Sequence, residues 1–131
     1  MPLLRTGRNI IAALLHGTAV TPLLTSTGAV LWVGSGSAAH SSLDNHLLAV
    51  SVAATMESGF PTQSVNVNTY RGLYATNVAN FGWMEWGVKN STVSATNTAA
   101  NVFMLQRMVE DLGLKANTQQ WQLTSTLTFT T

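Results

Sequence analysis

The stretch Trp121-Gln122-Leu123-Thr124-Ser125-Thr126-Leu127-Thr128-Phe129-Thr130 alternates strictly between two kinds of residue. Its odd-numbered positions carry large apolar side chains and one serine, whereas its even-numbered positions carry glutamine and threonine. Successive side chains of a β-strand point to opposite faces of a sheet, while a helix would spread the same pattern around its axis. We therefore predict a strand with its apolar face on a core and its threonine face toward water or a partner sheet.

Earlier segments of the chain also have the character of strands. Val30–Val33 is a short apolar run closed by Gly34-Ser35-Gly36-Ser37, which predicts a buried strand that runs into a turn. Further candidates are residues 47–55, where helix is also possible, 65–70, with Val65, Val67 and Thr69 on one face, 81–88 and 102–109. Strands at a spacing of about 12–20 residues with Gly, Asn, Ser and Thr between them indicate an all-β antiparallel sandwich or jelly-roll-like domain. We expect residues 1–131 to form this one domain.

A short helix is predicted near the N-terminus, with Thr6 as its N-cap and Gly17 just past its end. The residues before Thr6, or at most residues 1–8, would form an arm. The apolar run 10–15 is shorter than the roughly 7–15 residues of a secretory signal, and no stretch reaches the roughly 18 apolar residues of a membrane span. We therefore expect neither a signal peptide nor a membrane partner.

The composition is unusually poor in charge. Charged residues make up 8% of the chain, with a formal net charge of +1, while 44 of the 131 residues are Thr, Ser, Asn or Gln. So weak a field would not gather phosphates, so we expect no nucleic-acid partner. The absence of cysteine excludes disulfides and thiolate chemistry. Because neutral polar surface costs less to desolvate than charged surface, this composition favours a protein that assembles with other subunits.

Two local patterns could carry chemistry, and both are weak. Gly34-Ser35-Gly36-Ser37-Ala38-Ala39 fits G-x-G-x-x-A with Glu57 about twenty residues later, as in dinucleotide-binding domains. That motif requires a helix and a second parallel strand, which the rest of the chain does not suggest. His40, Asp44 and His46 could ligate a metal, but their spacing is equally typical of a polar loop. We expect no metal, no cofactor and no catalytic residue.

Glu85 is the unusual residue of the 81–88 segment. It would share a face with Phe81 and Trp83, and a carboxylate among aromatic side chains requires compensation. The alternatives are a basic partner such as Arg71 or Arg107, hydrogen bonds from backbone N–H groups, or a raised pKa. We interpret Glu85 as a structural clamp rather than a catalytic acid, because no second carboxylate lies nearby in the sequence.

The order of these signals resembles that of small tailed-bacteriophage virion proteins. Their sequences run from hydrophobic-x-Val-Gly-x-Gly to a polar stretch ending in Asp/Asn-x-x-Leu, then to Glu-x-Gly-hydrophobic-x-Asn, Leu-x-Arg and a closing strand. The matching segments here are Leu31 to Gly36, Ser42 to Leu47, Glu85 to Asn90, Leu105 to Arg107 and the threonine-rich C-terminal strand. The resemblance implies structural roles for Gly34 and Gly36 as turn glycines, Asp44 and Leu47 as anchors, and Glu85, Gly87 and Arg107 around the central strand.

The resemblance implies a non-enzymatic virion subunit. We expect a capsid decoration or cement protein that forms a dimer or trimer and binds the major capsid protein, with a tail, neck or fibre-anchoring protein as the alternative. A small metal- or ligand-binding β domain is the rival from another class. The candidate interface residues are Leu3 and Leu4 in the arm and Thr124, Thr126 and Thr128 on the C-terminal strand.

Overall fold

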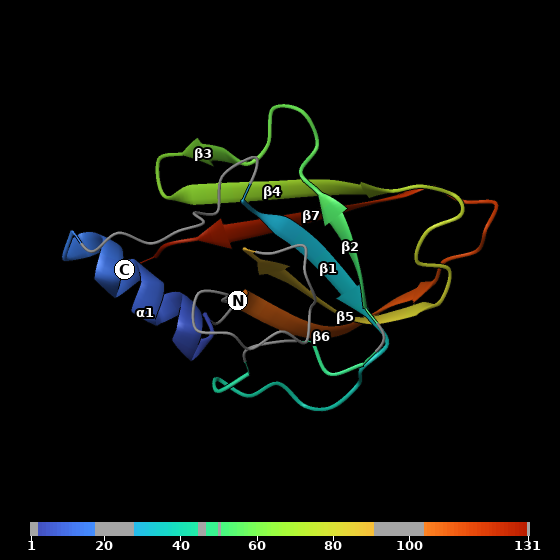
Figure 1. Cartoon of the computed structure of the whole chain (residues 1–131), viewed down its shortest axis with the longest axis horizontal. Helices are drawn as coiled ribbons and strands as arrows, with labels where there is room; N and C mark the ends of the chain where they lie inside the picture. The colour runs from blue at the N-terminus through green and yellow to red at the C-terminus, as the bar shows by residue number, and fades with distance from the viewer. Residues whose placement is uncertain (1–2, 18–27, 45–46, 50, 91–103, 131) are drawn as a thin grey trace.

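The computed structural model describes residues 3–17, 28–44, 47–49, 51–90 and 104–130, which form one helix and seven strands (Figure 1). The elements are α1 (Arg5–Leu15), β1 (Val30–Gly34), β2 (Ser51–Thr55), β3 (Thr62–Ser64), β4 (Val67–Tyr74), β5 (Gly82–Lys89), β6 (Met104–Leu114) and β7 (Trp121–Thr128).

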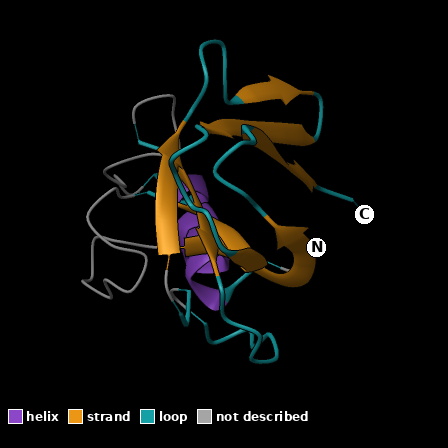
Figure 2. Ribbon diagram, turned by 90° about the vertical axis from the view of Figure 1, so that its right-hand side faces the viewer, coloured by secondary structure: helices purple, strands orange, loops and turns teal. Residues whose placement is uncertain are grey.

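The strands form two antiparallel sheets, with the orders β2-β1-β5-β6 and β3-β4-β7. An isolated antiparallel bridge between Met56 and Gly72 joins the end of β2 to β4. Figure 2 shows the two sheets in separate layers, with α1 beside the four-stranded sheet. The predicted fold class is confirmed: the protein is an all-β, sandwich-like domain with one short helix.

The strand predicted from the C-terminal alternation is β7, and its two faces are as expected. Leu123, Ser125 and Leu127 are buried, whereas the glutamine and threonines between them are exposed. Behind β7, the main core fills the space between the sheets. Trp83 lies at its centre, where its ring makes edge-to-face contacts with Tyr74 and Trp121 at centroid distances of 4.8 and 5.0 Å.

A second, smaller core covers the other face of the four-stranded sheet. Leu4, Val30, Trp32, Leu47 and Met104 pack together there. Leu4, just before α1, and Leu47, in the loop after β1, therefore cover the face of the sheet that points away from β7. This double covering explains why all five residues of β1 are buried.

The prediction that Glu85 shares a face with Phe81 and Trp83 is wrong. The pairing of β5 with β6 shifts register between Trp83 and Glu85. Across this shift, two steps along β5 correspond to four along β6, so the regular alternation of sides is interrupted between Trp83 and Glu85. Trp83 and Trp86 therefore both pack in the main core, and Glu85 points to the opposite face of the sheet.

The segment predicted at 65–70 is displaced in the structure. Val65 and Asn66 form the two-residue turn between β3 and β4, and Val65 has a φ of 53° and is 90% exposed. The strand starts at Val67 and continues to Tyr74. The proposed common face of Val65, Val67 and Thr69 is therefore wrong, because Val65 belongs to the turn.

The N-terminal helix exists, and the described part of the expected arm, residues 3–8, packs on the protein itself. The helix begins at Arg5, so Thr6 lies within it rather than capping it, and Gly17 follows its end with a φ of 80°. The Leu4 N–H donates to the Leu105 carbonyl at 3.2 Å, and the Arg5 N–H donates to the Ser42 carbonyl at 2.8 Å. Residues 4–8 are thus fixed against the chain's own strands and loop.

Candidate functional site

Glu85 and Arg107 form an ion pair that is completely enclosed by the protein. The Arg107 Nε donates to Glu85 Oε2 at 2.8 Å, and both side chains are 0% exposed. Adjacent strands β5 and β6 carry the two residues, and Gly87 of β5 lies directly opposite Arg107 of β6. A side chain at Gly87 would meet the Gln106 carbonyl at 2.5 Å, so glycine permits this close approach of the strands.

Three backbone N–H groups also converge on the Glu85 carboxylate. Gly36 donates to Oε1 at 3.1 Å and Ala49 at 2.9 Å, while Leu48 lies 3.0 and 3.2 Å from the two oxygens. These donors come from both ends of the long connection between β1 and β2. One carboxylate therefore fixes both ends of that connection to the sheet.

Arg107 extends the network to Asp44 in the middle of the same connection. One terminal nitrogen donates to Asp44 Oδ2 at 2.9 Å, and the other donates to the Ala38 carbonyl at 3.1 Å. Asp44 Oδ2 also accepts from the Ser41 N–H at 2.9 Å. We call Gly36, Asp44, Glu85 and Arg107 the Glu85 cluster.

The Glu85 cluster brings together four of the residues singled out in the sequence. Gly36 is a loop residue whose N–H contacts the carboxylate, whereas Gly34 is the last residue of β1 rather than a turn residue. Leu47 packs in the smaller core beside the cluster. Of the two basic partners considered for Glu85, the structure selects Arg107 together with backbone N–H donors.

Arg71, the other basic partner considered, pairs with Glu57 near the protein surface. Its Nε lies 2.5 Å from Glu57 Oε2, and its guanidinium lies 4.1 Å from the centroid of the Phe60 ring. Hydrogen bonds from Gln122 and Arg71 hold the pKa of Glu57 below its ordinary value. This pair links the turn after β2 to the outer face of the three-stranded sheet.

The geometry of the Glu85 cluster is that of a structural attachment between the β1–β2 connection and the four-stranded sheet. Buried charges are tolerated when they are paired and hydrogen-bonded, and here each carboxylate oxygen of Glu85 has several donors. General acid–base chemistry requires a group that can reach a substrate. Glu85 and Arg107 have no solvent-exposed surface, so the arrangement serves to hold the loop on the sheet.

The metal hypothesis finds no support among the described residues. His40 Nδ1 lies 3.8 Å from Asp44 Oδ2, and the Asp44 carboxylate is already engaged by Arg107. His46 lies outside the described residues. Within the described ranges, no three His, Asp or Glu side chains are grouped so that they could hold a metal ion.

Lys115 is a buried residue that is not among the candidates predicted from the sequence. Its side chain is enclosed at the end of β6, and its Nζ donates to the Ala75 carbonyl and to Asn80 Oδ1, both at 2.8 Å. The lysine therefore ties the connection between β4 and β5 to the end of β6. In the sequence, Lys115 is only a single charged residue that follows Leu114. That pattern does not identify hydrogen-bond partners 35 to 40 residues away in the sequence.

A second buried lysine, Lys89 at the end of β5, makes stability depend on pH. Burial lowers the pKa of Lys89 to about 8, from 10.5 in a model peptide. Between these two values the unfolded chain binds more protons than the folded chain, so stability rises with pH. Burial raises the pKa of Tyr70 and Tyr74, and these residues oppose folding only as pH approaches 10.

We therefore expect the free energy of unfolding to increase from pH 7.5 to 9.5, and Lys89→Met to flatten that increase. Urea denaturation at several pH values measures both slopes. Identical slopes for the two proteins would show that Lys89 is not the group responsible.

Gly36→Ala tests how tightly the Glu85 cluster is packed. An added Cβ would lie 2.4 Å from Glu85 Oε1. We expect a loss of about 1–3 kcal/mol of stability, because overpacking forces the carboxylate away from its donors. Gly82→Ala is the matched control, since nothing lies within 4 Å of its Cβ position, and we expect a change within about 0.5 kcal/mol. Equal midpoints of chemical denaturation would contradict the tight packing.

The candidate interface residues divide into two groups. Leu4 is fully buried in the smaller core, so the expectation that it reaches a neighbouring subunit is corrected, whereas Leu3 is half-buried against the main core. Thr124, Thr126 and Thr128 are exposed on β7.

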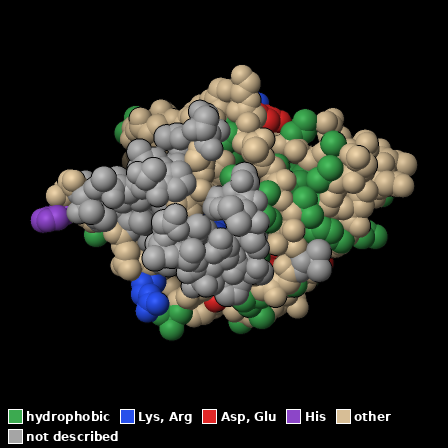
Figure 3. All heavy atoms as spheres, in the orientation of Figure 1, with side chains coloured by type: hydrophobic (Ala, Val, Ile, Leu, Met, Phe, Trp, Pro, Cys, Tyr) green, Lys and Arg blue, Asp and Glu red, His purple; other side chains and the backbone are tan. Residues whose placement is uncertain are grey.

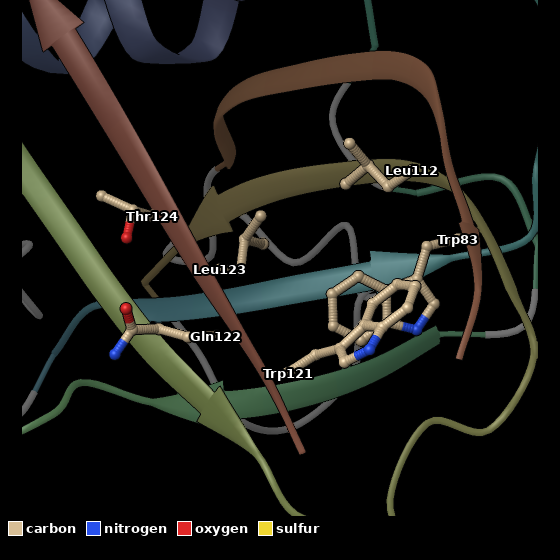
Figure 4. Close-up of a pocket in the computed structure, with 6 residues that line it drawn as sticks. All are labelled: Trp83, Leu112, Trp121, Gln122, Leu123 and Thr124. Carbon is tan, nitrogen blue, oxygen red and sulfur yellow. The ribbon is translucent and has the colours of Figure 1, made fainter. Parts of the chain in front are cut away.

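An open hollow of about 410 Å³ lies beside β7 (Figure 4). Its lining residues are Trp83, Leu112, Trp121, Gln122, Leu123 and Thr124. The indole rings of Trp83 and Trp121 lie together on one side of β7, while Gln122 and Thr124 point to the other side. The hollow therefore follows the edge of the strand and contacts both of its faces.

The only described helix is too short to cross a membrane. Comparison with known proteins gave no match: no family model matches the chain, and no curated protein or solved structure shows significant similarity to it. The structure therefore describes the chain by itself: it is an all-β sandwich-like domain in which the buried Glu85 cluster attaches the loop between β1 and β2 to the sheet.

Proposed function

We propose that this protein is a non-enzymatic structural subunit of a bacteriophage virion, and specifically a decoration protein that oligomerises on the capsid shell. The order of sequence segments supports the virion assignment by resemblance. The nearly uncharged surface supports the role in assembly, and this is the observation on which the proposal chiefly rests.

The surface carries even less charge than the composition suggests. Of the eleven charged residues, Glu85, Lys89, Arg107 and Lys115 are buried, and Asp44, Glu57 and Arg71 are half-buried. The exposed charged residues are Arg5, Arg8, Glu110 and Asp111. On the face shown in Figure 3, charged side chains form only small separate spots.

The outer face of the three-stranded sheet carries little charge and several threonines. Arg71 is the only charged residue in β3, β4 and β7. Threonines pair across the strands there, with Thr126 opposite Thr69 and Thr69 opposite Thr62. Short hydroxyl side chains lose less hydration energy and less side-chain entropy than charged side chains do when another protein covers them.

The proposal is tested on particles made from the genome that encodes this chain. Quantitative protein staining should find hundreds of copies per particle, and purified protein should bind again to shells from which it has been removed. A dozen copies or fewer would favour the neck or tail and overturn the decoration role. Complete absence from purified particles would overturn the virion assignment.

A further inference from the structure

Within the described ranges, strand β7 forms one edge of its sheet, since β4 is the one strand that pairs with it there. The Phe129 N–H donates to the Asn66 carbonyl at 2.9 Å, so at this position the backbone faces β4. In an antiparallel strand, the N–H and C=O of one residue point to the same side, and successive residues alternate. The even-numbered residues Gln122, Thr124, Thr126 and Thr128 therefore direct their backbone groups toward the free edge.

This edge has none of the features that usually block strand addition. Edge strands are commonly protected by charged residues, proline or bulges. The eight residues of β7 include no charged residue and no proline, and their pairing with β4 is regular throughout. Nothing in the strand itself opposes the approach of a second strand.

The two ends of β7 differ in shape in a complementary way. The open hollow lies at the start of the strand, beside Trp121 and Leu123. At the other end, Phe129 is 42% exposed, while its backbone is fixed by hydrogen bonds with Asn66. By alternation, Phe129 shares a face with Trp121, Leu123 and Leu127. A two-fold arrangement would bring each Phe129 to the hollow of the other chain.

We propose that a second copy of this chain pairs antiparallel with β7, with Ser125 opposite Ser125 of the partner subunit. This inference rests on the self-assembly in the proposed function and identifies its interface. The pairing places Trp121 opposite the partner's Phe129 and Leu123 opposite the partner's Leu127. These are non-hydrogen-bonded pairs, in which cross-strand side chains lie closest together.

The same register aligns the free backbone groups. Thr124 lies opposite the partner's Thr126, and Gln122 lies opposite the partner's Thr128, so residues that face the edge meet each other. With two hydrogen bonds per such pair, the two-fold interface makes about eight. In a register shifted by one residue, backbone groups that face the free edge would lie opposite groups that face β4, and all of these hydrogen bonds would be lost. The result is a six-stranded sheet with a continuous threonine face across both subunits.

Thr126→Pro and Phe129→Ala test the pairing in different ways. Proline at residue 126 removes an N–H that points away from β4, so the fold is retained while the dimer is lost. Phe129→Ala removes a side chain already exposed in the monomer and should weaken dimerisation roughly a hundredfold, because two phenylalanines leave each interface. Thr126→Val keeps the N–H and should dimerise as the unaltered chain does. Sedimentation equilibrium gives the dissociation constants, and circular dichroism confirms that each variant is folded.

Hydrogen exchange provides the second measurement. In the dimer, the amides of Thr124, Thr126 and Thr128 should be protected in a concentration-dependent way, whereas those of Leu123, Ser125 and Leu127 are protected at every concentration. The inference would be overturned if the exchange rates of the threonine amides did not depend on protein concentration. It would also be overturned if folded Thr126→Pro dimerised as tightly as the unaltered chain. A monomer that still binds capsid shells would refute this interface alone, and a β7 dimer absent from particles would refute only the proposed function.

Discussion

Arg107→Ala should lower the free energy of unfolding by about 3–5 kcal/mol, because it leaves a buried carboxylate without its counter-charge. Glu85 is 0% exposed and cannot turn toward water. Asp44 also loses its partner, and the connection between β1 and β2 loses its attachment at Ala38. Urea denaturation measures the loss, and limited proteolysis within residues 35–44 should become faster.

Arg71→Ala is the matched control for this prediction. It removes a second Arg–Glu pair of the described residues, in which the Arg71 side chain is 36% exposed. Surface pairs contribute at most about 1 kcal/mol, so we expect a much smaller change. Comparable losses of stability for the two variants would show that the Glu85 cluster does not attach the β1–β2 connection to the sheet.

Replacing the buried pair by apolar residues should not restore stability. In other proteins such replacement can be neutral, because both charges leave the core together. Here Glu85 also accepts hydrogen bonds from Gly36, Leu48 and Ala49. An apolar side chain would leave the buried Gly36 N–H unpaired, which costs about 1–3 kcal/mol, and would also remove the partner of the two partly buried donors. The double variant Glu85→Leu/Arg107→Met should therefore remain destabilised.

Leu127→Asp should leave the chain unfolded at room temperature. Leu127 is 4% exposed and packs in the main core between the sheets. The residue opposite on the neighbouring strand is the uncharged Asn68, and Arg71 of that strand lies on the other face, opposite Thr124. The expected loss of about 4 kcal/mol or more approaches the roughly 5–15 kcal/mol that stabilise an entire domain. Circular dichroism and tryptophan fluorescence would report the loss of structure.

Thr126→Asp, one residue away, should fold normally. Its side chain points out of the sheet and is exposed to water. The new charge lies on the threonine face, so it should weaken self-association while the melting temperature stays within a few degrees. Equal tolerance of aspartate at both positions would refute the assignment of the two faces of β7.

The sequence predicts β7 well because its two faces have different chemistry. The segment at β5 is harder, since large apolar residues occupy both faces and the bulge between Trp83 and Glu85 leaves no mark in such a pattern. Helix α1 is identified correctly, but its start is not, because tertiary hydrogen bonds at Leu4 and Arg5 decide where it begins. Local patterns thus predict elements, while contacts between distant segments decide their boundaries.

The candidate site shows the same division. That Glu85 needs compensation follows from its neighbours, but the choice of Arg107 over Arg71 depends on the pairing of β5 with β6. The backbone donors at Leu48 and Ala49 lie more than 35 residues away in the sequence, and nothing in their side chains announces the contact. Lys115 is missed for the same reason, since its partners are mainly carbonyl oxygens.

Because so many ionic groups are buried, contacts made by the remaining surface should depend little on salt concentration. Dissolved salt weakens attraction between exposed charges over a distance of about 10 Å at 0.1 M, and has far less influence on enclosed pairs or on contacts between hydroxyl groups. An assembly joined through the face of β3, β4 and β7 should consequently hold together from dilute buffer to strong brine, where complexes held by surface ion pairs come apart.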